Sequence, residues 1–381
     1  MGRYKIRDGL AKLPPLLDTK ISGRSDKTGE LLVRGYSLLE LGAVVSFEEM
    51  SYLLLYKKLP SSAQLQEFSE TLNKKNSLPS IMESVCAIFT GKEHPLDMIT
   101  SCLSAYASTQ ENPVKKNATY LIDQVISAMS YYALLLSIHV RKRLGLAAMF
   151  FTQHSDHSFS ENFIERCFGG KELKNKAYYL DLLLRFSSEH GLTCSTLAAR
   201  NSASARCSVI SSVIAAIQAW HGFRHGTASE YAYKDLLAIH EKGGDVEAYY
   251  LKQIKAGISP CGFGHRVFKT EKDPRTSAIE FYLKKLSNTL GSHPLYPIAQ
   301  NAVEFFEKRR NMYANPDLYI GIVLAILGFQ PQEMSAIVFM GRLAGISAHI
   351  LEENSPMRPL WRGKAQYTGM EKSLVVPIDK R

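Results

Sequence analysis

Several histidines and arginines of this chain stand beside glycine-marked turns. His190 lies in SEHGLT, His225 in HGFRHG and His265 in GFGHRV, while Arg275 ends the segment KDPR. An imidazole beside a turn can donate a hydrogen bond or exchange a proton near neutral pH. Asp317 follows in NPDLY, at the foot of an apolar helix, where partial burial would raise the pKa of its carboxyl group toward that of a useful base. These residue types indicate proton-transfer chemistry.

Each of these residues also has a purely structural alternative. A single histidine at a turn is more often a surface residue or a satisfied buried residue than a catalyst. An aspartate at the start of a helix is commonly its N-cap. The pair Gly262 and Gly264 is by itself a weak sign of a phosphate loop, because glycines serve turns of every kind. The case for a site therefore rests on the whole set of residues.

Closely spaced histidines do not predict a metal site here. His154 and His157 form a His-x-x-His pair in a polar loop, without cysteines or carboxylates at ligand spacing. His221 and His225, four residues apart, meet the same objection. We therefore expect no bound metal ion.

The chain has a formal net charge of +10, from 46 basic and 36 acidic side chains. This imbalance favours anionic partners without choosing among nucleic acid, a membrane surface and small polyanions. Basic residues are mixed with acidic ones, and no recognition-helix or stacking motif appears, so we expect no nucleic-acid partner. The apolar stretch 319–329 is too short to cross a bilayer and suits a buried helix, so we expect no membrane partner.

Six scattered cysteines without a CxxC pair predict reduced thiols. The N-terminal residues lack the apolar stretch of a signal peptide, and Ile6 stands where a myristoylation motif has serine or threonine. These features predict a cytoplasmic protein.

The elements that position the candidate residues are nearly all helices. Segments 46–49 (SFEE) and 61–64 (SSAQ) have the spacing of capping boxes, and an apolar stripe at helical spacing follows each. Asp245 can cap a further helix, which Gly257 can end in the left-handed conformation. Residues 19–37, with short extended runs between Gly and Asp turns, predict a small hairpin-like β-ribbon.

No fixed-period repeat, low-complexity tract or flexible linker divides the chain into independent domains. A second domain must therefore be an insertion within the first. The turns HGFRHG, CGFGHR and NPDLYIG are glycine-marked and could act as hinges or site loops, which places this insertion at about 218–323.

Taken together, the segments resemble the citrate synthase family, whose members condense an acyl-coenzyme A with a 2-oxo acid. The matching blocks follow the family's order nearly from end to end of the chain: LLVRGYSLLEL, SFEEMSYLLLYKKLP, EHPLDMITSCLSA, SENFIERCFGG, EHGLTCSTLAAR, GFRHGTASE, GFGHRVFKTEKDPR, NPDLYIG, GRLAGISAHILEE and KAQYTG. So many ordered blocks argue against chance. The resemblance implies an all-α fold with a short N-terminal β-ribbon. Its large helical domain, 1–217 and 324–381, holds a smaller inserted helical domain, 218–323, that closes over the substrates.

The resemblance also implies roles for individual residues. The family's two catalytic histidines are matched by His225 and His265, and its catalytic aspartate by Asp317. The ligands of the oxo acid's carboxylates are matched by His190, Arg275, Arg342 and Arg362, the last of which reaches in from the partner subunit of a homodimer. In the glycine-hinged loop, the residues placed to meet coenzyme A are Gly262, Gly264, Arg266 and Lys269.

The implied reaction is citrate synthesis from acetyl-coenzyme A, oxaloacetate and water, as in the tricarboxylic acid cycle. The methyl group of acetyl-coenzyme A is a feeble acid, so Asp317 needs a preorganised donor, His225, on the enolate oxygen. The enol carbon then attacks the ketone of oxaloacetate, whose oxygen His265 can meet. Bidentate guanidinium groups suit the two carboxylates. We expect acetyl-coenzyme A as a co-substrate and no permanently bound cofactor.

Several positions depart from the family pattern around the pocket. Arg224 puts a second positive charge beside His225, and Thr193 stands where asparagine is common. Residues 318–320 and 363–364 also differ from the usual residues. These changes leave two alternatives open: a 2-methylcitrate synthase that uses propionyl-coenzyme A, which Arg224 favours whereas GHRVFK favours citrate, and a paralogue that binds metabolites without turning them over.

Overall fold

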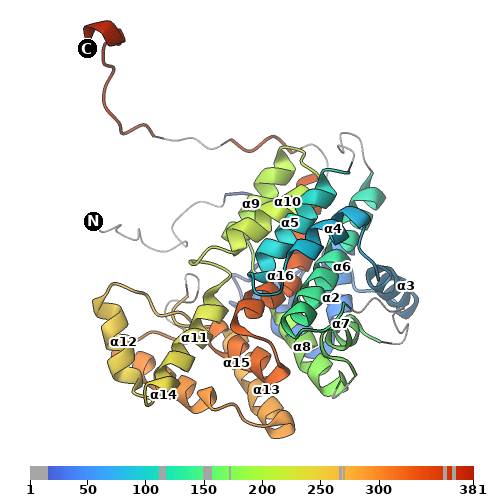
Figure 1. The fold of residues 1–381 in the computed structure, drawn as a ribbon, viewed down its shortest axis with the longest axis vertical. Coiled ribbons are helices and arrows are strands. Elements are labelled where there is room, and N and C mark those ends of the chain that lie inside the picture. Colours follow the sequence, from blue (N-terminus) through green and yellow to red (C-terminus); the bar gives the residue numbers. More distant parts are fainter. Residues whose placement is uncertain are drawn as a thin grey trace.

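The computed structural model describes residues 16–110, 117–148, 157–170, 173–265, 268, 271–354, 358–362 and 366–381. Helices follow one another along nearly the whole described chain (Figure 1). The strands are β1 (Ser22–Arg24), β2 (Leu31–Val33) and β3 (Tyr36–Ser37). The helices are α1 (Leu38–Val44), α2 (Phe47–Tyr56), α3 (Ser62–Asn73), α4 (Ser80–Ile88), α5 (Pro95–Ala107), α6 (Ala118–Arg143), α7 (Phe159–Phe168), α8 (Leu173–Ser187), α9 (Cys194–Ser204), α10 (Val209–Trp220), α11 (Ala228–Glu241), α12 (Val246–Lys255), α13 (Pro274–Leu290), α14 (Leu295–Arg310), α15 (Asp317–Leu327) and α16 (Pro331–Asn354), with a short 3₁₀ helix at Ile378–Lys380.

The N-terminal strands form one small antiparallel sheet in the order β1-β2-β3. Ser22 pairs with Val33, and Leu32 pairs with Ser37. This sheet confirms the β-ribbon predicted for 19–37. The succession of helices confirms the predicted mostly helical fold.

Local capping explains where several helices begin and end. Ser46 accepts a hydrogen bond from the N–H of Glu49, whose carboxylate accepts from the N–H of Ser46, so the predicted capping box starts α2. The predicted box at 61–64 starts α3 in the same way. Asp245 caps α12, and Gly257 adopts a φ of 76° just beyond the end of this helix. These helix boundaries are confirmed.

Helix α16 is the central element of the core (Figure 1), where it packs against α2, α6, α8, α9, α10 and α11. Two glycines allow it to approach the end of α8. A Cβ atom at Gly341 would lie 2.7 Å from the carbonyl oxygen of Leu184, and one at Gly345 would lie 2.3 Å from that of Ser188. Only glycine tolerates such contacts. This close approach places Arg342 beside the turn that follows α8.

Two helices, α6 and α16, are long and apolar enough to cross a membrane by length and composition alone. Their most apolar windows are 72% and 94% buried within the protein, which is the environment of core helices. The apolar stretch 319–329 coincides largely with α15, whose residues 318–324 are all buried. The expectation of a buried helix there is confirmed.

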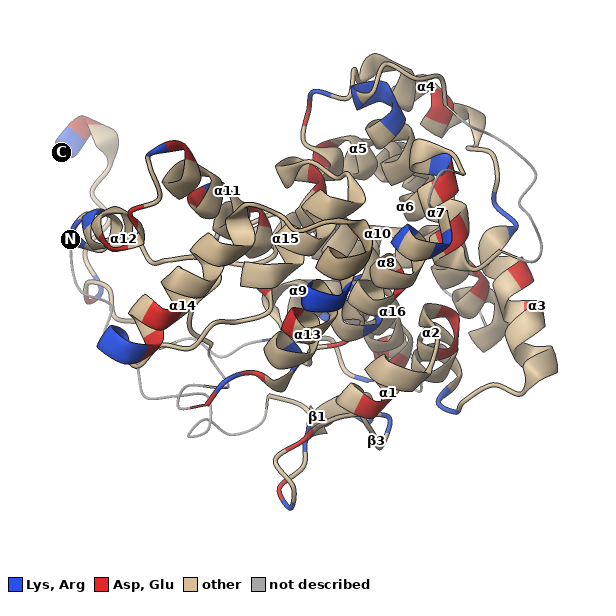
Figure 2. Ribbon diagram, turned by 90° about the horizontal axis from the view of Figure 1, so that it is seen from below, with Lys and Arg blue, Asp and Glu red and all other residues tan. Residues whose placement is uncertain are grey.

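Helices α11 to α15 lie together on one side of the molecule (Figure 1), where α11 packs against α14 and α15, and α12 against α14. The segment 218–323 covers α11 to α14 and the first part of α15. Its definition as a separate, closing domain stays a prediction. Basic and acidic residues are interspersed along the helices of both parts (Figure 2).

Candidate active site

The predicted residues come from elements that are far apart in sequence. The elements and residues are the turn after α8 (His190), the turn between α10 and α11 (His225), the loop between α12 and α13 (His265), the first turn of α13 (Arg275), the start of α15 (Asp317) and the middle of α16 (Arg342). All six residues belong to the part of the chain that the structure describes.

Three of the residues contact one another directly. Nε2 of His190 lies 3.2 Å from Nη2 of Arg275 and 3.2 Å from Nε2 of His265. A guanidinium group can only donate, so Nε2 of His190 is an acceptor and its proton lies on Nδ1. The N–H of Phe268 donates to Nδ1 of His265 at 3.1 Å, so we assign the proton of His265 to Nε2, which donates to His190. Both rings are therefore neutral.

Burial is the main reason that these imidazoles are neutral. It lowers the pKa of His190 well below its ordinary value, and the Arg275 and Arg342 guanidinium groups lower the pKa further. Burial also lowers the pKa of His265, where the nearby carboxylate of Asp273 opposes the shift and Arg275 adds to it. Neutral imidazoles in this place can act as hydrogen-bond donors without carrying charge into the site.

The guanidinium of Arg275 is held in place by Asp273. Oδ2 of Asp273 accepts from Nη2 of Arg275 at 2.6 Å, and Oδ1 accepts from Nε at 3.2 Å and from the backbone N–H at 2.9 Å. Asp273 is only 1% exposed. Burial alone would raise the pKa of this carboxyl group, but the contacts with Arg275 outweigh burial and lower it. Our sequence analysis did not single out Asp273, although its place before Pro274 marks it as the N-cap of α13.

His225 is oriented by Ser195, a second residue that the sequence analysis missed. The backbone N–H of Ser195 donates to Nε2 of His225 at 3.2 Å, and the Ser195 hydroxyl lies 2.9 Å from the same nitrogen. A backbone amide cannot accept a proton, so Nε2 carries the lone pair. His225 is thus neutral, with its proton on Nδ1. Ser195 lies in EHGLTCST, five positions after His190, at the start of α9.

The loops that carry His265 and Asp317 are joined through Asn315. The backbone N–H of Asn315 donates to the carbonyl oxygen of Gly262 at 2.9 Å. The side-chain amide of Asn315 donates to the carbonyl oxygen of Gly264 at 3.0 Å. The side-chain oxygen of Asn315 accepts from the N–H of Asp317 at 3.0 Å. Both glycines have positive φ, 80° and 75°, which lets the backbone make this close pairing. The pairing sets the spacing between an imidazole and a carboxylate.

The carboxyl group of Asp317 has the properties of a moderate base. Burial raises its pKa to about 6, against the opposing effect of the Arg275 and Arg342 guanidinium groups. The expectation of a raised pKa is confirmed. The alternative role as an N-cap does not apply, because Pro316 occupies the N-cap position of α15 and Asp317 is its first helical residue.

Arg342 provides a second buried cation. Its Nε donates to the carbonyl oxygen of Ser187 at 2.6 Å, and its guanidinium lies 5.4 Å from the ring centroid of Trp220. The Trp220 ring in turn meets the ring of His225 edge-on, with the centroids 4.9 Å apart. Burial lowers the pKa of Arg342 to about 10, so it stays charged at neutral pH. The tryptophan thus links an arginine from α16 to a histidine from the α10–α11 turn.

Three predicted residues do not join this cluster in the described structure. Arg266 and Lys269 lie outside the described residues. Arg362 is exposed on the segment after α16, next to Trp361, whose Nε1 donates to Glu353 at 3.0 Å. The predicted position of Arg362 in the site of a partner subunit therefore stays a prediction.

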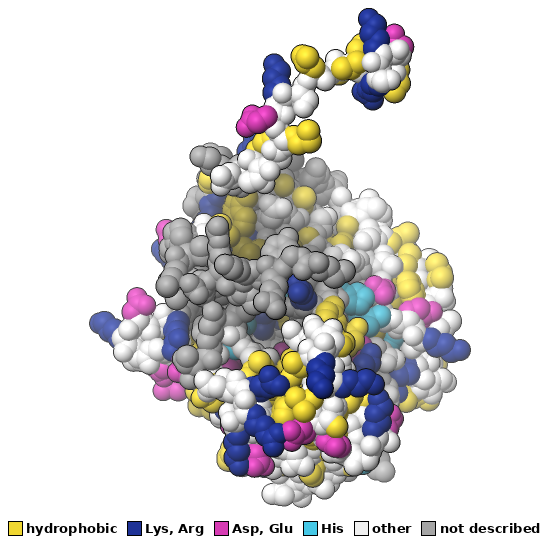
Figure 3. Space-filling view, turned by 90° about the vertical axis from the view of Figure 1, so that its left-hand side faces the viewer, with side chains coloured by type: hydrophobic (Ala, Val, Ile, Leu, Met, Phe, Trp, Pro, Cys, Tyr) yellow, Lys and Arg dark blue, Asp and Glu magenta, His cyan; other side chains and the backbone are white. Residues whose placement is uncertain are grey.

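Basic side chains gather on the outer face of the α11–α14 group. Figure 3 shows Lys and Arg side chains surrounding hydrophobic ones on the lower part of this face. Two helices of this group end in basic residues, which are Lys252 and Lys255 in α12 and residues 308–310 in α14. This surface is suited to a polyanionic ligand.

Comparison with known proteins identifies relatives over the full length of the chain. The family model described as "Citrate synthase, C-terminal domain" matches residues 9–363. The citrate/2-methylcitrate synthase of Bacillus subtilis is 28% identical over 92% of this chain and 94% of its own length. The citrate synthase of Saccharolobus solfataricus is 30% identical over 95% and 96%. The ternary complex of Thermoplasma acidophilum citrate synthase with carboxymethyl coenzyme A and oxaloacetate superimposes with a TM-score of 0.87, at 26% identity, covering 96% of this chain and 97% of that one.

Proposed function

Because this chain belongs to the citrate synthase family of acyltransferases, which use acyl-coenzyme A, we propose that it condenses acetyl-coenzyme A with oxaloacetate and water to give citrate and coenzyme A. The observation that carries the proposal is the direct contact of His190 with both Arg275 and His265, beside a carboxyl group whose pKa is about 6. This group of residues combines binding of an anion with proton transfer.

The proposed binding site for oxaloacetate is formed by His190, Arg275 and Arg342. A substrate carboxylate is a stronger partner for the Arg275 guanidinium than the neutral nitrogen of His190, so binding replaces the 3.2 Å contact between them. His265, which carries its proton on Nε2, can then turn this donor from His190 to the substrate, whereas His190 can donate only from Nδ1. In a homodimer, Arg362 from the other copy completes the set.

The proposed chemistry starts with proton removal from the methyl group of acetyl-coenzyme A by Asp317. With a pKa of about 6, this carboxyl group is ionised at neutral pH and more basic than an ordinary aspartate. His225 donates from Nδ1 to the enolate oxygen, since its Nε2 is engaged by Ser195. The enol carbon attacks the ketone of oxaloacetate, where His265 donates to the developing alkoxide. Water then hydrolyses the thioester of the condensed product.

Coenzyme A is proposed to bind along the loop that follows α12. Gly262 and Gly264 let the backbone approach the ligand, and Arg266 and Lys269 supply charge for the phosphates. The basic face of the α11–α14 group (Figure 3) supports the proposal that a polyanionic substrate binds on this side of the molecule. No permanent cofactor takes part in the proposed reaction.

A second candidate reaction is 2-methylcitrate synthesis from propionyl-coenzyme A. The Bacillus subtilis relative is named for both products, and the exposed Arg224 next to His225 is a departure from the family pattern. A thiol-release assay separates the candidates: acetyl- and propionyl-coenzyme A are compared at equal concentration with oxaloacetate and other 2-oxo acids. We expect the higher kcat/KM with acetyl-coenzyme A and oxaloacetate, and a preference for propionyl-coenzyme A would reverse the assignment.

A third candidate is a paralogue that binds metabolites without turning them over. Calorimetry that shows oxaloacetate binding, with no thiol release from any acyl donor, would establish it. We propose instead an active, cytoplasmic homodimer that serves the tricarboxylic acid cycle. Asp317→Asn, which should bind oxaloacetate but lose activity by several orders of magnitude, is the control that ties thiol release to this site.

A further inference from the structure

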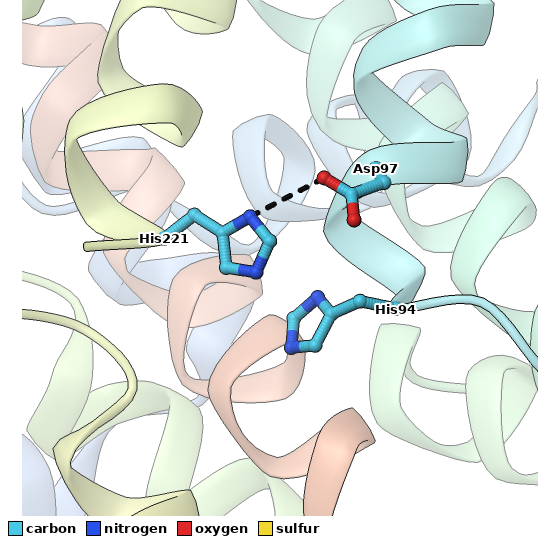
Figure 4. Close-up of side chains that lie close together, drawn as sticks. All are labelled: His94, Asp97 and His221. Carbon is cyan, nitrogen blue, oxygen red and sulfur yellow. Dashed lines mark ion pairs between the residues drawn. The ribbon is translucent and has the colours of Figure 1, made fainter. Parts of the chain in front are cut away.

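A cluster of histidine and carboxylate side chains lies outside the proposed active site, at the junction of α5, α10 and α11 (Figure 4). One potential ligand atom each from His94, Asp97 and His221 lies within 4.8 Å of the others. Nδ1 of His221 is 3.3 Å from Oδ1 of Asp97, and the rings of His94 and His221 stack with centroids 4.2 Å apart. The reaction proposed above uses none of these residues.

We propose that His94, Asp97 and His221 bind a divalent transition-metal ion, with Zn²⁺ as the best-matched ion. Two imidazole nitrogens and one carboxylate oxygen are the ligands of tetrahedral zinc sites that keep water in the fourth position. Mg²⁺ and Ca²⁺ are disfavoured because they prefer oxygen ligands alone. The cluster departs from our sequence-based expectation of no metal, which considered His221 only together with His225.

The hydrogen bonds of His94 fix the tautomer that a metal ion bound at Nδ1 requires. The N–H of Leu96 donates to Nδ1 of His94 at 3.2 Å, so this nitrogen carries a lone pair and the proton lies on Nε2. Nε2 faces Oε2 of Glu230 at 3.3 Å, and Glu230 is in turn held by Lys234 at 2.6 Å. A carboxylate behind the distal nitrogen is the usual support of a metal-bound histidine. Figure 4 shows the Nδ1 side of the ring directed toward Asp97.

Access and charge also favour an ion at this place. The side chains of His94, His221 and Asp97 are 16%, 28% and 54% exposed, so an ion can enter from solvent. Two carboxylates, Asp97 and Glu230, compensate its charge. Nδ1 of His221 faces the Asp97 carboxylate, which can only accept, so an ion bound to this nitrogen displaces its proton, and an ion bound to Nδ1 of His94 replaces the Leu96 contact.

The site joins segments on both sides of the predicted domain boundary. His94 and Asp97 belong to the start of α5, whereas His221 is the C-cap residue of α10, four positions before His225. Glu230 lies on α11. A bound ion would therefore tie α5 to the turn that carries His225. If the function proposed above holds, this tie restrains that turn during closure, and Zn²⁺ lowers kcat.

Calorimetric titration of the chelator-treated, full-length protein with ZnCl₂ tests the binding step without any assay of activity. The test variants are Asp97→Asn and His221→Ala. The control is His157→Ala, which removes an imidazole that also faces a carboxylate, Glu165 at 3.3 Å, outside the cluster. We expect one site in the wild type and the control, weakened at least tenfold in both test variants. Asp97 is more than half exposed, so Asp97→Asn keeps the test valid even if His221→Ala does not fold.

Equal zinc isotherms for the wild type and Asp97→Asn would overturn the site and assign the binding to groups outside the cluster, such as the exposed thiols of Cys194 and Cys207. Thiol-release kinetics test the regulatory step separately. We expect Zn²⁺ to lower kcat of the wild type reversibly, with EDTA restoring it, and to have at most a tenth of this effect on Asp97→Asn. Zinc bound at the cluster with unchanged kcat would overturn the restraint on the turn. A protein that releases no thiol either with or without zinc would refute the proposed function and leave the binding result intact.

Discussion

Ser195 contacts one nitrogen of His225 twice, with its hydroxyl at 2.9 Å and its backbone N–H at 3.2 Å from Nε2. The two contacts together decide where the proton of the imidazole lies. Because the amide can only donate, Nε2 is an acceptor and the proton of the neutral imidazole lies on Nδ1. The start of α9 therefore acts as a positioning element for a histidine that is 30 residues away in sequence.

The first prediction concerns the hydroxyl group of this pair. Ser195→Ala removes the contact at 2.9 Å and keeps the backbone amide. Loss of one buried hydrogen bond, about 1–1.5 kcal/mol, should lower kcat about tenfold. The KM for oxaloacetate should change little, since its proposed ligands stay in place. Ser211→Ala, in the first turn of α10, is the matched control and should behave like the wild type. An unchanged kcat in Ser195→Ala would assign the positioning to the amide alone.

The pH profile of the reaction should follow the ionisation of Asp317. Its pKa of about 6 means that the carboxyl group is increasingly protonated, and inactive as a base, as the pH falls below this value. We expect kcat/KM to fall about tenfold per pH unit on this limb. Thiol release measured between about pH 4.5 and 8 gives the profile. A profile that stays flat down to pH 5 would mean that another group removes the proton.

The same carboxyl group should destabilise the folded protein at neutral pH. Its pKa of about 6 in the folded state exceeds the ordinary value of 3.8, so the folded state binds the proton more tightly than the unfolded state. The stability from this proton is complete below about pH 4 and is lost as the pH rises through about 6. Asp317→Asn cannot ionise and should be more stable than the wild type at pH 8, by roughly 1–3 kcal/mol. Urea unfolding should show this gain at pH 8 and a much smaller one near pH 4.

Local features of this fold could be predicted, whereas the long-range contacts could not. The capping box at 46–49 depends on side chains three positions apart, so the sequence alone specifies it. The contact between Ser195 and His225 depends on how α9 packs against α10, and no local pattern reports that packing. The same holds for Asp273. Its N-cap position can be predicted from the sequence, but its side-chain hydrogen bond with Arg275 cannot. The raised pKa of Asp317 was predictable because it follows from burial at the foot of an apolar helix.

The close pairing of the two site loops makes a further prediction about Gly262. A Cβ atom there would lie 3.1 Å from Cβ of Leu318 and 3.2 Å from Cβ of Ala232, at a φ of 80°. Gly262→Ala should therefore destabilise the protein by about 1–3 kcal/mol and lower kcat, since the loop that carries His265 must shift. Gly257→Ala is the matched control, because Gly257 has a φ of 76° with nothing within 4 Å of the added Cβ. Equal losses in stability and kcat for both variants would attribute the effect to backbone conformation alone.

The proposed sharing of Arg362 between subunits can be tested by complementation. In this chain Arg362 is exposed on the segment after α16. Asp317→Asn and Arg362→Ala should each be nearly inactive when purified alone. If Arg362 acts in the partner's site, a mixed dimer has one site with both residues intact and one site with neither.

Co-expression of the two variants should therefore restore about a quarter of the wild-type kcat, since about half of the dimers are mixed and each of these has one working site of its two. Mass spectrometry of the intact dimers measures the mixed fraction, and the recovered activity should scale with it. Co-expression of Asp317→Asn with His225→Ala is the control: both residues act within one chain, so no site in that mixed dimer is intact. Mixed dimers of Asp317→Asn and Arg362→Ala without recovered activity would place Arg362 in the site of its own chain.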